Sequence, residues 1–181
     1  MSDPDMSDST PPSHPGPPPE PGPAPTAGPA PGGVRYADLG KRFLARLIDA
    51  LLVGVPLTIV LWLLPGISVG GLIANVLSAV VGLGYFVVLE TSQGATFGKQ
   101  WLGLQVTDEA GTSPITTDAS LRRNWWLLLG VLGSIPVIGF LAGLASLAVV
   151  IVIVTTISSD ARGQGWHDKL AGTLVIERAT S

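Results

Sequence analysis

Three long apolar blocks constrain this chain more than any other feature of its sequence. They run from Phe43 to Leu64, from Val69 to Leu89 and from Trp125 to Ile157. A helix needs about twenty apolar residues to cross a hydrocarbon core about 30 Å thick, and the first two blocks have that length. Charged residues make up 13% of the sequence, against about 25% in soluble domains. We therefore expect an all-α polytopic membrane protein.

The third block is too long for one simple span, because it runs for 33 residues without a charge. A proline with flanking glycines interrupts it at Gly133–Gly139, a pattern typical of a turn or sharp kink. Hydropathy alone favours one crossing of the membrane. We prefer two helices, over 118–134 and 138–157. With helices over 43–64 and 69–89, the expected fold has about four transmembrane or re-entrant helices.

The lysines and arginines favour this even number of crossings, since they mark the cytoplasmic side of a membrane protein. The turn after the first block has none. The other connections carry Lys41, Arg42 and Arg46, then Lys99, Arg122 and Arg123, and finally Arg162, Lys169 and Arg178. All three basic regions then lie on the cytoplasmic side, together with both termini.

The expected cytoplasmic loop, 91–117, has the pattern of a small β cap. Apolar and polar residues alternate in "LGLQVTD" (102–108), and Glu109-Ala110-Gly111 predicts a turn into a short second strand, which would form a β-hairpin. A further strand is predicted in "AGTLVIE" (171–177). We expect it to pair with 102–108, which requires the third block to return the chain to the same side.

Residues 1–34 form a tail of different composition. Its first 33 positions hold 12 of the 16 prolines and no lysine or arginine. Such a tract cannot bury enough apolar surface to offset its ordering entropy, so it is expected to be disordered. It is either a solvated spacer or a docking arm for a partner that binds proline-rich segments. We expect no secretory signal peptide, since the first apolar run begins only after residue 42.

Four charged residues fall on one face of the first predicted helix. Asp38, Arg42, Arg46 and Asp49 follow one another at spacings of 4, 4 and 3. An ion pair between Arg46 and Asp49 along the helix would lessen the penalty of placing both in the membrane. The group either fixes how this helix packs, provides a carboxylate that binds a proton or cation, or engages a partner or lipid headgroup.

A polar stripe is predicted on the second helix. Asn75, Ser78, Gly82 and Tyr85 recur at spacings of 3, 4 and 3. Small and hydrogen-bonding residues in this pattern are typical of contacts between membrane helices.

Motifs for catalysis are not found. "GATFGKQ" (94–100) includes Gly98 and Lys99 but lacks the glycine spacing and the Ser/Thr of a phosphate-binding loop. His167 and Asp168 are neighbours without a nucleophile motif. With two histidines and no cysteine, a metal site is not expected either. We predict no enzyme activity, catalytic residue, cofactor or nucleic-acid partner.

Four ordered segments, "KRFLARLID", "TSQGATFGKQWLGLQVTDEAG", "LRRN" and "RGQGWHDKLAGTLVI", resemble the RDD family of bacterial membrane proteins. The resemblance covers residues 35–178 and implies an inner-membrane location. The arginine and two aspartates that name the family correspond to Arg42, Asp49 and Asp168. Arg46 stands where the family usually has an uncharged residue. The tail is also similar to that of bacterial proline-rich antigen proteins.

Two hypotheses about function follow. The first is an accessory or assembly subunit of a larger membrane complex, suggested by the small size, the proline-rich arm and the lack of a catalytic motif. The second is an oligomeric transporter coupled to an ion or solute through Asp49. The expected partners are the lipid bilayer and either another membrane protein or further copies of this chain. Asp168 is expected in the cap or at the membrane surface, within reach of Arg42, Arg122 or Arg123.

Overall fold

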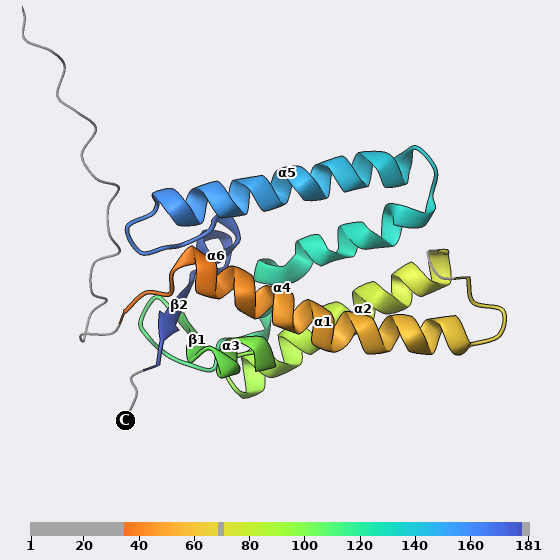
Figure 1. The fold of residues 1–181 in the computed structure, drawn as a ribbon. Coiled ribbons are helices and arrows are strands. Elements are labelled where there is room, and N and C mark those ends of the chain that lie inside the picture. Colours follow the sequence, from red (N-terminus) through yellow and green to blue (C-terminus); the bar gives the residue numbers. More distant parts are fainter. Residues whose placement is uncertain (1–34, 69–70, 179–181) are drawn as a thin grey trace, which may run out of the picture.

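A computed structural model of the protein describes residues 35–68 and 71–178. The tail predicted at 1–34 lies outside the described residues, so its disorder stays a prediction. The described chain is mostly helical, and its long helices lie alongside one another, with the short helices and the strands gathered at one end (Figure 1). We call this end, built from residues 93–124 and 160–178 together with 35–37, the cap.

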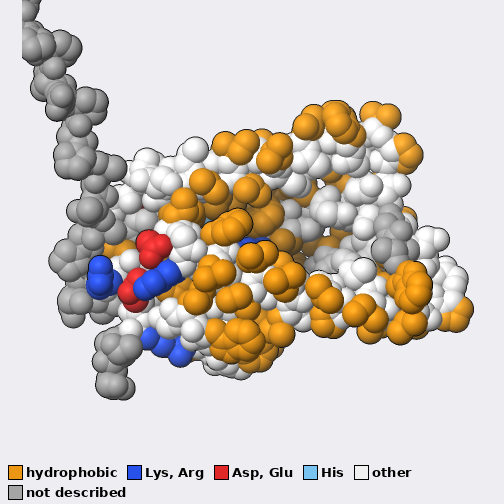
Figure 2. All heavy atoms as spheres, in the orientation of Figure 1, with side chains coloured by type: hydrophobic (Ala, Val, Ile, Leu, Met, Phe, Trp, Pro, Cys, Tyr) orange, Lys and Arg blue, Asp and Glu red, His pale blue; other side chains and the backbone are white. Residues whose placement is uncertain are grey.

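Three helices are long and apolar enough to cross a membrane: α1 (Leu39–Leu63), α2 (Leu72–Ser92) and α5 (Ile138–Ser159). Helix α1 begins four residues before the predicted start, because the Asp38 carboxylate caps it by accepting a 2.9 Å hydrogen bond from the Lys41 amide. Helix α2 continues past the predicted end at Leu89 to include Glu90. On the face drawn in Figure 2, apolar side chains are spread along these helices, and most of the charged side chains lie at the cap end.

The third apolar block reverses direction where the sequence predicts a break. Trp125–Ser134 forms a 3₁₀ helix, η1, and α5 packs against it after a turn at Ile135–Val137. Gly139 lies against the Gly133 carbonyl, where a Cβ atom would come within 2.7 Å of the oxygen. The segment predicted as one helix over 118–134 is helical throughout, but it changes type: α4 (Thr117–Asn124) passes directly into the 3₁₀ helix η1 at Trp125. A 3₁₀ helix rises about 2.0 Å per residue, so the ten residues of η1 extend about 20 Å. Ten residues of an α-helix would extend about 15 Å.

The sheet of the cap joins two segments far apart in the sequence. Strands β1 (Leu104–Asp108) and β2 (Thr173–Glu177) pair antiparallel, with Val106 opposite Val175, as predicted. Residues 35–37 lie along the other edge of β2, where the Ala37 amide donates to the Val175 carbonyl at 3.0 Å. The predicted β-hairpin is wrong, because the chain after the turn at Gly111 forms no strand and continues to α4.

Two short helices complete the cap. Helix α3 (Phe97–Trp101) packs against α1, and α6 (Trp166–Ala171) packs against α4. The apolar core of the cap contains Ala37, Ala45, Leu104, Val106, Ile115 and Val175. Because Ala45 belongs to α1, this core continues into the start of the first membrane helix. Charged residues near that start therefore face the cap rather than lipid.

Candidate functional site

An ion pair between Arg42 and Asp168 stands at the centre of the site. Arg42 lies near the start of α1 and Asp168 in the first turn of α6, and Nη1 of the arginine donates to Oδ2 of the aspartate at 2.6 Å. Nη1 of Arg123, in α4, lies 3.0 Å from the other oxygen of Asp168. All three side chains are buried. The pair therefore links the cap to α1, and the predicted neighbours Arg42 and Arg123 are confirmed.

Glu90, at the end of α2, forms a second buried charge centre. Its carboxylate accepts hydrogen bonds from the Lys99 ammonium at 2.5 Å, the Ser120 hydroxyl at 2.8 Å and the Asn124 amide at 3.1 Å. Nε of Arg123 lies 3.7 Å away and joins this centre to Asp168. The sequence analysis missed Glu90 as a site residue. The sequence did carry a signal for this residue. Glu90 is an acid that directly follows an apolar run, and the lysine of the "GK" segment comes shortly after it.

Asp49 is held by three hydrogen bonds rather than by an ion pair. It accepts from the Tyr85 hydroxyl at 2.7 Å, the Thr96 hydroxyl at 2.6 Å and the Gly98 amide at 2.8 Å. Gly98 approaches α1 so closely that a Cβ atom would meet the Ala45 carbonyl and the Asp49 carboxylate. Asp49 therefore fastens α3 and α2 to α1.

The expected ion pair between Arg46 and Asp49 is wrong. Within the described residues, no oxygen of an acid lies within ion-pair distance of Arg46. Its guanidinium carbon instead lies 3.8 Å from the centre of the Phe86 ring and 5.1 Å from that of Trp126. The oxygens of Asp49 are already occupied by Tyr85 and α3, so Arg46 turns to the aromatic faces, which attract a cation.

The remaining residues singled out in the sequence lie apart from this network or beside it. Arg122 forms an exposed pair with Asp118 at 2.9 Å on the surface of α4 and does not reach Asp168. Asn75 lies near the start of α2, far from the cap, on the predicted polar stripe. Within the described residues, no three His, Asp or Glu side chains gather as metal ligands.

The buried cap groups have shifted pKa values. Burial lowers the pKa of His167 to about 4, and the charges of Arg123 and Arg42 add to this shift while Asp168 opposes it. The imidazole is therefore neutral near pH 7. Burial would raise the pKa of Asp168, but Arg123 and Arg42 hold it well below its usual range. Burial lowers the pKa of Lys99 to about 8 although Glu90 opposes the shift.

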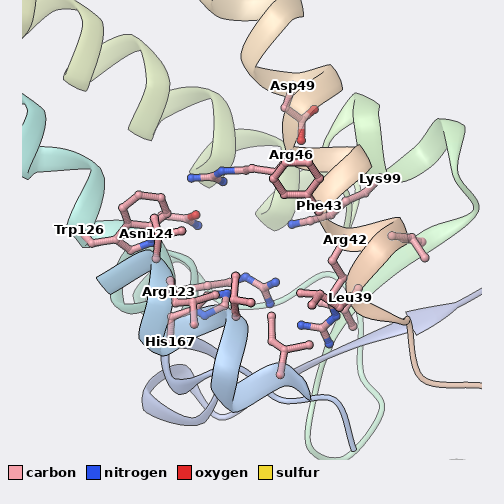
Figure 3. Close-up of a pocket in the computed structure, with 16 residues that line it drawn as sticks. Leu39, Arg42, Phe43, Arg46, Asp49, Lys99, Arg123, Asn124, Trp126 and His167 are labelled. Carbon is pink, nitrogen blue, oxygen red and sulfur yellow. The ribbon is translucent and has the colours of Figure 1, made fainter. Parts of the chain in front are cut away.

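Two cavities have Arg46 and Asp49 in both of their linings. The cap-side cavity, of about 260 Å³, is lined by Arg42, Arg46, Asp49, Lys99, Arg123 and His167 together with apolar residues of α1 and α5. Figure 3 shows the cationic side chains around the cap-side cavity. The bundle cavity, of about 420 Å³, lies between α1, α2 and η1. All four residues of the predicted stripe, Asn75, Ser78, Gly82 and Tyr85, line it, so they share one face of α2.

Comparison with known proteins identifies the family of this chain. No curated protein and no solved structure matched the chain. A sequence model of the RDD family matches residues 36–172, which include Arg42, Asp49 and Asp168 and leave out the tail and β2. Because that match covers most of the sequence and three helices are suited to crossing a membrane, the chain belongs to the RDD family and is an integral membrane protein.

Proposed function

We propose that the protein lies in the bacterial inner membrane with its cap in the cytoplasm. The turns at the end of the bundle opposite the cap, residues 64–68 and 133–138, carry no charge, whereas the lysines and arginines lie at the cap end. This asymmetry is the usual mark of the cytoplasmic side. In this arrangement η1 and α5 cross in opposite directions, and both termini are cytoplasmic.

Single-cysteine labelling tests this orientation, since the chain has no cysteine of its own. Ser68 is exposed at the end opposite the cap, and Glu109 is exposed on the cap. A membrane-impermeant maleimide should label Ser68→Cys in intact protoplasts and Glu109→Cys only after lysis. The opposite pattern would place the cap outside the cell.

Within that membrane, the accessory or assembly subunit is the role that the geometry supports best. The observation that carries it is how the buried acids are held: Asp49 and Glu90 each accept hydrogen bonds from two other elements, and Asp168 pairs with arginines of α1 and α4. A carboxylate that carries a proton or cation must exchange its partners, whereas one held from several elements keeps a structure together. The protein then acts as a rigid membrane unit within a larger complex.

A pull-down of the tagged full chain in a mild detergent, followed by mass analysis, tests this role. A foreign membrane protein in stoichiometric amount supports it. Recovery of the chain with itself alone contradicts it.

Transport is the second candidate, and the two cavities that share Arg46 and Asp49 in their linings favour it. Polar groups of Asn75, Ser78 and Tyr85 line the bundle cavity and lead towards Asp49. Because four helices are few for a pathway, such a transporter would be an oligomer. Flux in liposomes should then be abolished by Asp49→Asn and preserved by Asp118→Asn, which removes an exposed acid. Normal flux in Asp49→Asn removes the carboxylate mechanism.

A further inference from the structure

The cap-side cavity holds more positive than negative charge. Four cationic side chains line it, Arg42, Arg46, Lys99 and Arg123, and Asp49 is the acid among its lining residues. Two further acids, Glu90 and Asp168, are not among the lining residues but form ion pairs with these cations. Four cations therefore stand against three carboxylates in this part of the described chain. The remaining positive charge is buried, where an anion would be attracted most strongly.

Donors on two of these arginines are left without partners. Arg42 uses Nη1 for Asp168, but its Nε and Nη2 are buried and have no hydrogen-bond partner within the described residues. The same holds for Nη2 of Arg46. The Arg42 side chain is only 8% exposed, so bulk water does not satisfy these groups. Buried N–H groups are normally bonded, and the guanidinium fork matches the oxygens of a phosphate.

The other side of the cavity is apolar and faces outwards. Leu39 and Phe43 of α1 line it, together with Val150, Ile153, Val154 and Ile157 of α5. Phe43 is 66% exposed and Val150 is 41% exposed. Both α1 and α5 are suited to the membrane, so this wall is open to hydrocarbon chains. An occupant that suits both sides has an anionic head and an apolar tail.

We propose that the cap-side cavity binds the phosphate group of an anionic phospholipid, whose acyl chains lie against α1 and α5. The volume of about 260 Å³ far exceeds the ~10–15 Å³ needed for one water. It suits a phosphate and its glycerol, while the chains lie along the helices outside. Basic pockets between membrane helices at the cytoplasmic surface are suited to anionic headgroups. This inference does not depend on the accessory role or on transport.

Native mass spectrometry of the purified full chain with added lipid tests the proposal. Phosphatidylglycerol should bind, and diacylglycerol with the same chains, which lacks the phosphate, should bind at least about tenfold more weakly. Arg46→Gln removes a cavity charge that has no ion-pair partner, and it should weaken phosphatidylglycerol binding by about tenfold. Arg122→Gln is the matched control, because it removes an exposed arginine outside the cavity, and its binding should be unchanged.

A second variant keeps every charge and fills the apolar side. Val150→Trp places a larger ring at a partly exposed position and should also weaken lipid binding, so the test holds even where Arg46→Gln fails to fold. Inorganic phosphate at equal concentration should not displace the lipid. Displacement of the lipid by inorganic phosphate would show that the cavity binds free phosphate, and it would overturn the proposal of a phospholipid. Equal binding by wild type, Arg46→Gln and Val150→Trp, or an equal loss in Arg122→Gln, would overturn the site itself.

Discussion

Arg42 and Asp168 are 126 positions apart in the sequence, and their side chains meet at 2.6 Å. One belongs to a membrane helix and the other to a short helix of the cap, and Arg123 supports the pair from α4. Two of the three residues for which the RDD family is named thus form one bond between cap and bundle. The third, Asp49, makes a separate connection through Tyr85, Thr96 and Gly98.

Removing the charge of Asp168 is expected to destabilise the protein strongly. Asp168→Asn leaves Arg42 buried without its counter-charge and Arg123 with Glu90 alone, and breaking a buried pair in this way reduces the free energy of unfolding by about 3–5 kcal/mol. Adding Arg42→Gln removes one of the stranded charges, so the double variant should lose less than the sum of the two single losses. Thermal unfolding in detergent measures all three. Strictly additive losses would show that the two side chains are not coupled.

Glu90→Gln is expected to have a large effect and Glu177→Gln a small one. Glu90 is fully buried against Lys99, so its neutralisation leaves a buried ammonium and lowers the free energy of unfolding by about 3–5 kcal/mol. Glu177 also pairs with a lysine, Lys41, but this lysine side chain is 44% exposed, and such pairs contribute about 0–1 kcal/mol. Denaturation of both variants in the same detergent gives the comparison. Similar losses would contradict the buried network.

The elements of this fold were largely predictable, because helix length, turn glycines and strand alternation are local signals. The pairing of 102–108 with 171–177 was predicted from their strand patterns, and the charge asymmetry, which places both segments on one side, agreed with it. Side-chain partners were harder to predict. Arg46 and Asp49 are spaced for a pair along α1, but donors from α2 and α3 occupy the aspartate first. Glu90 was missed for a similar reason, since its partners come from two later segments, α3 and α4. Tertiary contacts decided both cases.

Gly98→Ala is expected to loosen α3 from α1. The added methyl group would meet the Ala45 carbonyl and the Asp49 carboxylate, and the backbone at that carbonyl cannot turn away as a side chain can. Overpacking of this kind reduces the free energy of unfolding by about 1–3 kcal/mol. Gly84→Ala is the matched control, because its methyl group has no atom within 4 Å among the described residues. Since alanine favours a helix, that variant should unfold no more easily than the wild type. Equal behaviour of the two variants would contradict the close approach at Gly98.

His167 should make the protein less stable as the pH falls from 6.5 to 4. Its pKa in the folded protein is about 4, below the ordinary value of 6.5, so the unfolded chain takes up the proton first. The stability contributed by the neutral imidazole is complete above pH 6.5 and is lost progressively down to pH 4. The difference of about 2.5 pKa units corresponds to a loss on the order of 3 kcal/mol. His167→Gln has no proton to gain at this position, while the acids titrate in both proteins. Unfolding free energies measured at several pH values should therefore converge towards acid pH, with the wild type losing more than the variant. Parallel pH profiles would mean that the imidazole is not held neutral beside Arg42 and Arg123.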